Sequence, residues 1–392
     1  MQLISVTIEK YAPPGNGLGF YQGKAVFVAQ AVVGDKLLVK IEKEKKRYII
    51  GSLSEIIKAA PERCQPSCPH YEKCGGCDLL QLSYADQLSL KQDMLEQVLA
   101  GSGTLVPATV IAAPRTTAYR HRAIFHFDHD LRQIGFLQRR SHKVVPVPDC
   151  PILAPGLQKL LSEFSENPEL LLSGISTCYA LANSRGEYAA VGCRGRFSQR
   201  NLKVLKNISE TVTEDYGFGE LELAAAGFAQ VNPQITAIII KDLISHCADS
   251  DVIAELYGGS GTLSLALATV ATQLTVYESD LAAAARGRHN LKRNGFENVR
   301  FIGGRVEKSK LKSNLNTLVV DPPRVGLSPA VVEMMARSSV AKIIYISCNP
   351  ATLARDISRL KDLSPSLTLK SIQAYDMYPG TTHLEVMAVM ER

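Results

Sequence analysis

Hydrophobic residues follow two patterns along the chain, and the change between them divides it. From about residue 223 to the end, short apolar runs alternate with segments of helical periodicity; the runs are VIAELY, LTVYESD, TLVVDPP and KIIYISC. Helices are expected to begin near Ser328 and Pro350. This alternation predicts a parallel, doubly wound α/β sheet. Ligands of such sheets bind at the carboxyl ends of the strands, so the residues directly after each strand are site candidates.

The first half of the chain has a different texture. Residues 1–60 are short strands separated by glycine turns, which predicts a small β-barrel. Residues 61–80 are irregular and rich in Pro, Cys and Gly, and residues 107–222 are mainly strands and turns. We assign these two segments to one strand-rich central domain. Residues 81–106 contain a predicted helix that is expected to pack on the C-terminal domain, residues 223–392.

Charge is distributed unevenly, although the net charge of +6 is only mildly basic. Residues 1–60 hold nine Lys or Arg against five Asp or Glu, with Lys43, Lys45, Lys46 and Arg47 close together. A second basic group runs from Arg115 to Lys143 and includes Arg120, Arg122, Arg132, Arg139 and Arg140. Two separate basic regions favour an extended polyanion as the partner. The alternative for the first group is a solvated charged hairpin.

Composition limits the cellular setting. The chain has 392 residues, of which 46% are hydrophobic and 21% charged, as in globular proteins. No apolar run reaches the roughly 18 residues of a membrane helix, and the N-terminus lacks the layout of a signal peptide. We therefore expect a cytoplasmic protein without a membrane partner. In that reducing compartment, the nine cysteines are better interpreted as metal ligands or catalytic thiols than as disulfides.

A candidate cofactor site follows the first two strands of the C-terminal region. The glycine-rich loop from Leu256 to Thr262 opens a helix but lacks the Lys-Ser/Thr ending of a phosphate-gripping loop. Glu278, at the end of the next strand, supplies a carboxylate that can accept hydrogen bonds from both ribose hydroxyls. These features fit either a dinucleotide or an adenosyl cofactor.

The segment Asp321-Pro322-Pro323-Arg324 favours the adenosyl cofactor, because it looks like the substrate-base loop of nucleic-acid methyltransferases. Enzymes that methylate exocyclic amines usually have an aromatic residue after the two prolines. Here the residue is Arg324, which argues against an amine as the acceptor.

Cys348 is the candidate nucleophile. It lies in Ser347-Cys348-Asn349-Pro350, between an apolar strand and a helix. This position directs the side chain toward the ligand crevice, and the helix N-terminus is expected to stabilise a thiolate. Addition of the sulfur to carbon 6 of a uracil would activate carbon 5 for methylation. A base must then remove the carbon 5 proton, and Glu385 is our candidate. Spacing alone would favour a surface carboxylate on an edge strand.

With these residues, the sequence resembles the RNA 5-methyluridine methyltransferase family over nearly its whole length. The motifs, in the family's order, are Phe228-Ala229-Gln230-Val231-Asn232, the cofactor strand, Asp-Pro-Pro-Arg, Ser-Cys-Asn-Pro, and Asp376-Met377-Tyr378-Pro379 with His383 and Glu385. The resemblance implies an OB-like TRAM barrel at the N-terminus, a class I methyltransferase domain at the C-terminus, and S-adenosylmethionine as the cofactor. Departures are Glu255, where the family often has Asp, and Gly258, where it often has Cys.

The resemblance also assigns residue roles. It implies that Gln230, Tyr257, Glu278 and Asp321 contact the cofactor or its surroundings, that Cys348 is the nucleophile and that Glu385 is the base. Phe228 would line the pocket of the target uracil.

Cys64, Cys68, Cys74 and Cys77 fall within fourteen residues, which predicts a metal or iron–sulfur site. Their spacing alone would permit a zinc site built from these four. The resemblance instead implies that Cys68, Cys74, Cys77 and the distant Cys150 hold a [4Fe-4S] cluster, with Cys64 as a bystander.

The resemblance makes RNA the partner, with 23S ribosomal RNA favoured over tRNA, and we expect a monomer. Two rival functions remain open at this point. One is a nucleic-acid amine methyltransferase, and the other is a cluster-bearing RNA-binding protein whose methyltransferase fold is inactive.

Overall fold

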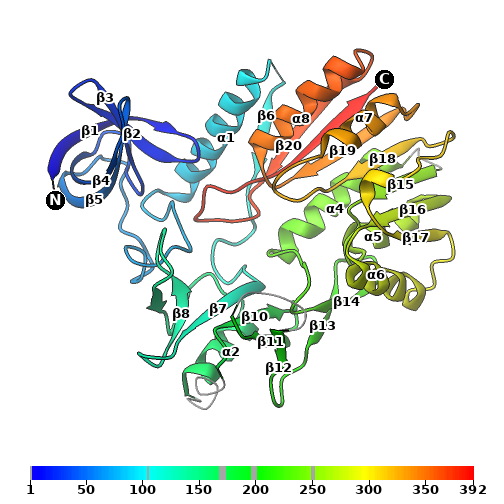
Figure 1. Ribbon diagram of the computed structural model, residues 1–392, viewed down its shortest axis with the longest axis horizontal. Coiled ribbons are helices and arrows are strands. Elements are labelled where there is room, and N and C mark those ends of the chain that lie inside the picture. The colour runs from blue at the N-terminus through cyan, green and yellow to red at the C-terminus, as the bar shows by residue number, and fades with distance from the viewer. Residues whose placement is uncertain (1, 104–105, 167–173, 196–200, 249–251) are drawn as a thin grey trace.

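The N-terminal residues form a closed five-stranded barrel (Figure 1). Its strands are β1 (Leu3–Ala12), β2 (Asn16–Tyr21), β3 (Lys24–Val28), β4 (Lys36–Glu44) and β5 (Tyr48–Lys58). Alternate residues of β1, namely Ile4, Val6 and Ile8, are buried inside the barrel. The computed structural model describes residues 2–103, 106–166, 174–195, 201–248 and 252–392. The closed ring of five strands confirms the small β-barrel that the strand spacing predicted.

The C-terminal region is built on an eight-stranded sheet of order β17-β16-β15-β18-β19-β21-β20-β6. The strands are β6 (Ala108–Ile111), β15 (Val252–Leu256), β16 (Gln273–Glu278), β17 (Val299–Gly303), β18 (Thr317–Val320), β19 (Lys342–Ser347), β20 (Thr368–Tyr375) and β21 (Glu385–Glu391). Strands β15 to β19 are parallel neighbours, whereas β21 is antiparallel to both β19 and β20. The last strand in sequence thus lies inside the sheet.

Helices cover both faces of this sheet, as the doubly wound prediction requires (Figure 1). One hydrophobic cluster joins it to α4 (Pro233–Cys247), α5 (Thr262–Val270) and α6 (Leu281–Arg293). A second cluster joins it to α1 (Tyr84–Gly101), α7 (Pro329–Arg337), α8 (Pro350–Leu363) and the 3-10 turn η2 (Val306–Lys308). Ser328 is the N-cap of α7 and Pro350 begins α8, so both predicted helix starts are confirmed.

The central region contains a six-stranded antiparallel sheet of order β12-β11-β10-β7-β8-β9. Its strands are β7 (Arg122–Asp128), β8 (Gln133–Leu137), β9 (Val144–Pro146), β10 (Thr177–Ala182), β11 (Tyr188–Cys193) and β12 (Leu202–Val204). Helix α2 (Pro155–Glu166) packs on it through Leu157, Leu160, Leu161 and Phe164. A separate hairpin is formed by β13 (Thr211–Asp215) and β14 (Glu220–Ala224).

Two features of this region differ from the sequence-based expectation. Residues 107–222 were expected to be mainly strands and turns, and they also contain the helix α2, as the apolar spacing of its buried residues allows. Strand β6 was assigned to the central domain, but it pairs in parallel with β20 and extends the C-terminal sheet. A four-residue strand carries no signal about which of two sheets it joins.

Of the helices in the described part of the chain, none combines the length and hydropathy that crossing a bilayer requires.

A buried ion pair ties the barrel to the cysteine-bearing segment that follows it. Asp35 is fully buried and accepts hydrogen bonds from Val32 N at 2.7 Å, Ala60 N at 2.9 Å and Arg63 Nη2 at 2.6 Å. Burial alone would raise the pKa of Asp35, but the hydrogen bonds from Arg63 and the two backbone amides bring it below its ordinary value of 3.8. The interaction therefore stabilises the fold fully above that pH and is lost as the pH falls below it.

We predict that Asp35→Asn lowers the free energy of unfolding of the barrel by roughly 2–4 kcal/mol, because Arg63 loses its buried anionic partner. Hydrogen exchange of the β1–β5 amides measures this change in the full chain. Glu44→Gln, which removes an exposed ion pair with Lys24 in the same barrel, is the matched control and should change little. Equal effects of the two substitutions would contradict the assigned role of Asp35.

Candidate active site

Four of the predicted site residues lie at one edge of the large sheet. Tyr257, Asp321 and Cys348 directly follow β15, β18 and β19, and Glu278 is the last residue of β16. These strands are adjacent and parallel, so their carboxyl ends meet at the same edge. The topology therefore brings together residues that are as far as about 90 positions apart in sequence.

The loop after β15 is held in an unusual backbone conformation. Tyr257 has a φ of 67°, in the left-handed region that bulky residues rarely adopt. The N–H groups of Tyr257 and Gly258 both donate to the carbonyl oxygen of Tyr277, at 2.9 and 3.2 Å. Gly261, with a φ of 91°, then begins α5. Strain of this kind concentrates at ligand sites, and here it turns the loop backbone toward the sheet edge.

Glu278 organises this loop from the neighbouring strand. Its Oε2 accepts from Gly259 N at 2.9 Å, and its Oε1 accepts from Asp280 N at 2.6 Å. Both oxygens therefore already bind backbone amides, whereas the sequence suggested that they were free for two ribose hydroxyls. Oε1 also accepts from Ser279 Oγ at 3.3 Å. A carboxylate has about four acceptor positions, so Oε2 can still accept one more hydrogen bond.

A third carboxyl group, Glu255, was noted in the sequence only as a departure from the family pattern. It lies inside β15, is 1% exposed, and accepts a hydrogen bond from Ser264 Oγ at 2.5 Å. Burial raises its pKa to about 8, the Ser264 hydroxyl opposes this shift, and the charges of Asp321 and Glu278 add to it. The carboxyl groups at this edge are thus crowded, which favours a cationic ligand.

Cys348 lies at the junction of β19 and α8. The next residue, Asn349, caps α8 by accepting from Ala351 N at 3.1 Å and donates from Nδ2 to Arg324 O at 3.0 Å. Burial raises the pKa of the Cys348 thiol to about 11, and the nearby Glu385 carboxylate adds to that effect. This is opposite to the predicted stabilisation of a thiolate by the helix N-terminus. Desolvation and neighbouring negative charge outweigh the helix end in the ligand-free protein.

Glu385 lies opposite Cys348. In the antiparallel pairing of β19 with β21, the last pair is Ser347 and Val386, and Cys348 and Glu385 are the residues directly beyond it; the Glu385 charge acts on the Cys348 thiol. Glu385 is 5% exposed, because β21 lies between two strands; it is not the surface residue on an edge strand that spacing alone favoured. Burial and the nearby Asp321 raise its pKa well above the usual range, and Arg324 opposes this shift.

Asp321 keeps part of its surface exposed, but the protein packed around its carboxyl group raises its pKa to about 7. Two adjacent carboxyl groups cannot both ionise easily, so Asp321 and Glu385 titrate as a pair. Such a pair holds a proton near neutral pH in the absence of ligands.

Arg324 is the cation that sequence reasoning overlooked as a site residue. It follows the two prolines after β18, and its charge lowers the pKa of both Cys348 and Glu385. It also lines, with Cys348 and His383, a cavity of about 270 Å³ that is closed on other sides by Pro13 and Pro14 of the barrel and by α1. The position of Arg324 directly after the candidate substrate loop was the available signal.

The segment before α4 is joined to the central region by hydrogen bonds from Arg122 and His121. Phe228 is 64% exposed, so its ring is free to contact a ligand, and Gln230 is half-buried. Arg122 Nη2 donates to Gly227 O at 2.7 Å and fixes the start of this segment. Asn232 caps α4 through Oδ1, while its buried Nδ2 has no hydrogen-bond partner among the described residues.

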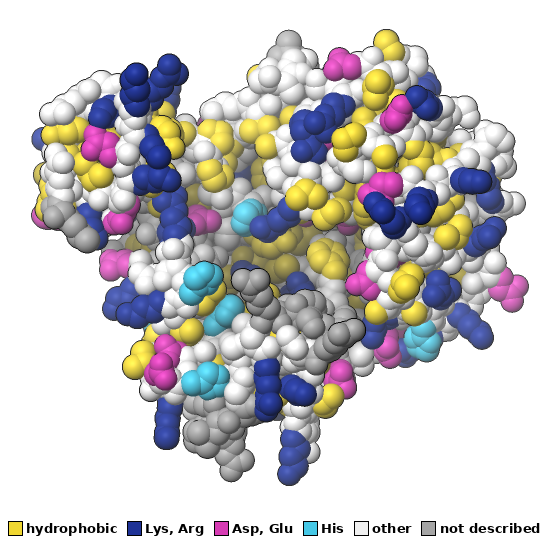
Figure 2. Space-filling model, in the orientation of Figure 1, with side chains coloured by type: hydrophobic (Ala, Val, Ile, Leu, Met, Phe, Trp, Pro, Cys, Tyr) yellow, Lys and Arg dark blue, Asp and Glu magenta, His cyan; other side chains and the backbone are white. Residues whose placement is uncertain are grey.

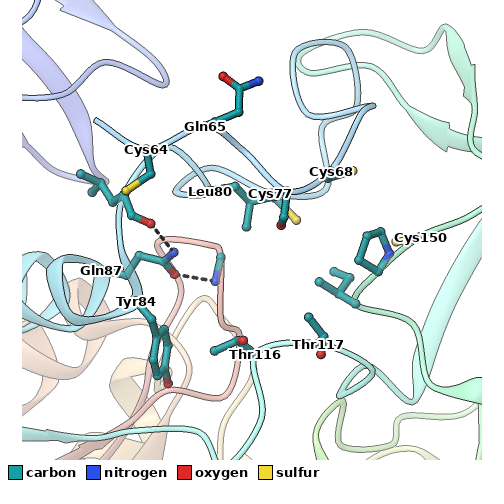
Figure 3. A pocket seen from close by; sticks show the side chains of 15 residues that line it. Cys64, Gln65, Cys68, Cys77, Leu80, Tyr84, Gln87, Thr116, Thr117 and Cys150 are labelled. Carbon is teal, nitrogen blue, oxygen red and sulfur yellow. Dashed lines mark hydrogen bonds between the residues drawn. The ribbon is translucent and has the colours of Figure 1, made fainter. Parts of the chain in front are cut away.

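The predicted cluster ligands also come together. Cys68, Cys74, Cys77 and Cys150 line one cavity of about 80 Å³, with Arg120 at its wall. Cys64 does not line it. Instead it lies on the far side of a neighbouring pocket, next to Gln87 and away from Cys68 and Cys150 (Figure 3). Burial raises the pKa of the Cys77 thiol to about 12 and that of Cys150 to about 11, and the charges of the other cysteines add to both shifts.

Within the part of the chain that the structure describes, no three or more His, Cys, Asp or Glu side chains form a group that could hold a metal ion. Both ligand sets, the one with Cys64 and the one with Cys150, therefore stay predictions. The remaining cysteines, Cys178, Cys193 and Cys247, are buried.

The basic groups fall into two classes. Lys43, Lys45, Lys46 and Arg47 are all exposed on the β4–β5 hairpin, and Figure 2 shows Lys and Arg side chains along the barrel and around the central hollow of this face. In the second group, Arg115, Arg132, Arg140 and Lys143 are exposed. Arg139, in contrast, pairs with Asp78 and donates to Cys77 O, and Arg122 is largely buried. Part of the second group is therefore structural.

Relatives of the chain match it over nearly their full length. A model of the tRNA (uracil-5-)-methyltransferase family matches residues 216–392. An RNA methyltransferase of Gloeobacter violaceus is 30% identical, and the match covers 100% of this chain and 97% of that protein. The 23S rRNA (uracil(1939)-C(5))-methyltransferase RlmD of Vibrio cholerae is also 30% identical, with 98% and 94% covered.

A solved structure has the same fold. The tRNA (uracil-54, C5)-methyltransferase of Pyrococcus abyssi, determined in complex with S-adenosyl-L-homocysteine, superposes with a TM-score of 0.81. The match covers 98% of this chain and 99% of that one at 23% identity, and at this identity it concerns the fold alone. The sequence relatives carry the assignment further: this chain belongs to the RNA (uracil-5-)-methyltransferase family.

Proposed function

We propose that this protein transfers the methyl group of S-adenosylmethionine to carbon 5 of a uridine in RNA through a covalent adduct between Cys348 and carbon 6. One observation carries the mechanism: Cys348 and Glu385 lie directly beyond the last pair of the β19–β21 register, at the edge where Glu278 and Asp321 also end. A nucleophile and a base are thus adjacent, next to a carboxylate-rich site suited to a cationic methyl donor.

The reaction has two stages. First, the Cys348 thiolate adds to carbon 6, the pair of electrons of the 5,6 double bond moves onto carbon 5 as an enolate, and carbon 5 takes the methyl group from the sulfonium. The donor leaves as S-adenosylhomocysteine. Second, the Glu385 carboxylate removes the proton from carbon 5, the double bond re-forms, and the sulfur leaves carbon 6 as a thiolate. Covalent catalysis replaces one difficult displacement with these easier steps.

The charges in the ligand-free site favour this order, in which the Cys348 thiolate acts first and the Glu385 carboxylate second. Cys348 needs a nearby cation to ionise, and Arg324 supplies it. Glu385 must be ionised for the second stage, and in the free protein Asp321 opposes this. A positively charged methyl donor beside Gln230, Tyr257, Glu278 and Asp321 would favour ionised carboxylates. The base would therefore become competent once both substrates are in place.

We propose RNA binding along the barrel and the central region, with 23S rRNA as the preferred substrate and tRNA as the second candidate. The exposed cations of the β4–β5 hairpin and of the Arg115–Lys143 segment support contact with a phosphate backbone. The 30% identical relative that acts on 23S rRNA supports the ribosomal choice. Phe228, an exposed aromatic residue in the segment before α4, fits stacking on the target uracil.

We also propose that Cys68, Cys74, Cys77 and Cys150 hold a [4Fe-4S] cluster. The four thiols line one cavity, and a [4Fe-4S] cluster binds each of four thiolates through a separate iron. Arg120 at the cavity wall would balance part of the negative charge of thiolate ligands. Such a group would join the 68–77 segment to Cys150 in the central region.

We predict that Cys348→Ala abolishes methylation but leaves S-adenosylmethionine binding nearly intact, because the thiol acts on the base. RNA that contains 5-fluorouridine cannot lose its carbon 5 substituent as a proton, so it should trap the unchanged protein as a stable adduct and fail to trap this variant. Cys64→Ala, at an exposed cysteine, is the control and should be trapped like the unchanged protein. An adduct formed by Cys348→Ala would rule out the proposed nucleophile.

The rate of adduct formation with this RNA should rise about tenfold per pH unit between pH 6.5 and 8.5, because the thiolate is a minor species well below a pKa of about 11. Arg324→Met should slow the reaction at every pH in this range, since removing the cation raises the thiol pKa further. The control is Arg337→Met, an exposed arginine at the end of α7. A rate that is independent of pH would mean that the thiolate is already formed in the RNA complex.

Anaerobically purified protein should be brown and contain about four iron and four sulfide per chain. Replacing any of Cys68, Cys74, Cys77 or Cys150 with Ser should remove the colour and lower methylation, whereas Cys64→Ser should do neither. The comparison of Cys64→Ser with Cys150→Ser decides between the two ligand sets. Zinc in place of iron, with Cys64 essential and Cys150 dispensable, would refute the cluster.

A further inference from the structure

The segment that leads into Glu385 is buried without being part of a helix or strand. Residues 376–384 connect β20 to β21, and Asp376, Met377, Thr381 and Leu384 are all at most 3% exposed. A connection of this kind has no ladder of its own to hold it. Its position therefore depends on hydrogen bonds from other parts of the chain.

Helix α1 supplies the first of these contacts. Lys91 is fully buried, and its Nζ donates to Asp376 Oδ1 at 2.5 Å and to Tyr378 O at 3.1 Å. Gln87, one turn earlier on the same helix face, accepts from Gly380 N at 2.9 Å (Figure 3). Two side chains of one helix thus hold the segment at three points.

The cysteine-bearing segment supplies the second set. The backbone amides of Asp78 and Leu79, directly after Cys77, both donate to Gly380 O, at 2.8 and 2.9 Å. Gly380 has a φ of 79°, and a Cβ there would lie 2.9 Å from Leu80 Cδ2. The two segments therefore meet through backbone hydrogen bonds, and a side chain at Gly380 would have the rare left-handed φ and would displace the end of Leu80.

The central region supplies the third contact. Tyr119 is 2% exposed, and its hydroxyl donates to Pro379 O at 2.8 Å. Three regions outside the β20–β21 connection thus hold three consecutive residues, Tyr378, Pro379 and Gly380, through their carbonyl oxygens.

These residues adjoin the base. The Tyr378 ring packs on His383 with centroids 5.7 Å apart, and it lies near Glu385: burial and then the Glu385 charge raise the pKa of its hydroxyl to about 12. Cys348 and Asp321, in contrast, directly follow β19 and β18, which pair with each other in parallel. Loosening this connection should therefore affect the work of Glu385 more than that of Cys348.

We propose that Tyr119, Gln87 and Lys91 are positioning residues for Glu385, acting through the Asp376–Gly380 segment to favour removal of the carbon 5 proton. The inference rests on the proposed function, in which Glu385 is the base. In the step concerned, the carbon 5 proton passes to the Glu385 carboxylate, the electron pair re-forms the 5,6 double bond, and the Cys348 sulfur leaves carbon 6. Faulty positioning should slow this step and leave methyl transfer nearly unchanged.

The test measures the two stages separately in the full-length protein. Unmodified 23S rRNA transcribed in vitro is mixed with S-adenosylmethionine labelled in its methyl group, and samples are quenched in detergent and separated on a denaturing gel. Label that migrates with protein is the methylated adduct, and label in free RNA is released product. Glu385→Gln should trap nearly all of the label as adduct.

Tyr119→Phe keeps the ring and removes only the hydroxyl, so the ratio of adduct to released product should rise on the order of 2- to 10-fold, as expected for the loss of one hydrogen bond. The total label transferred in the first turnover should change little. Gln87→Met, which removes the acceptor for Gly380 N, should have the same effect. It provides a second test in case Tyr119→Phe does not fold. Tyr188→Phe, whose hydroxyl bonds Glu163, is the matched control and should behave like the unchanged protein.

The outcomes distinguish the inference from its basis. If Glu385→Gln traps adduct but Tyr119→Phe and Gln87→Met release product at the normal rate, the positioning role is wrong and the proposed function stands. The positioning role is also wrong if both variants slow methyl transfer and release equally, since that is a general structural effect. If Glu385→Gln traps no adduct although the unchanged protein methylates the RNA, Glu385 is not the base, and both proposals fall.

Discussion

The placement of β21 between β19 and β20 is the constraint on which the site depends. A strand added at the outer edge of the sheet would leave its first residue near solvent, whereas an inserted antiparallel strand buries Glu385 directly opposite the end of β19. The insertion also requires the chain to return from β20 through a buried connection. The burial of Glu385, the proposed base, and the buried 376–384 connection, which other regions hold by hydrogen bonds, thus both result from this topology.

Burial of carboxyl groups at this edge has an electrostatic consequence. Glu255, Asp321 and Glu385 all have raised pKa values, and Arg324 is the cation that lowers the pKa of Glu385. The same environment raises the pKa of Cys348. The free protein therefore disfavours both the thiolate and the ionised base, and a cation near the carboxylates would relieve both restraints. A site of this type is poorly reactive until it is occupied, which protects a partly exposed thiol from unwanted chemistry.

The sequence predicted those parts of the structure that depend on local signals. Ser328 marked the start of α7 and Pro350 that of α8. The apolar runs predicted the strands whose ends carry Tyr257, Asp321 and Cys348. It failed where the answer depends on partners distant in sequence. The short β6 joined the other sheet, Glu385 proved to be buried, and the thiol of Cys348 proved to be disfavoured as an anion by burial and by a carboxylate 37 residues away in the chain. Strand order and burial set these properties, and neither can be deduced from a single segment.

The 376–384 connection also explains why the three regions of the chain are coupled. The barrel is tied to residue 63 by the Asp35–Arg63 pair, the following segment reaches Gly380 through Asp78 and Leu79, and Arg139 of the central region holds the same segment at Cys77 and Asp78. The barrel and the central region, which carry the exposed basic residues, thus share a continuous set of contacts with the segment that leads into Glu385. The contact of Asp78 and Leu79 with Gly380 is made by backbone atoms alone, so it constrains position more than side-chain identity and can persist among relatives that share about 30% of their residues.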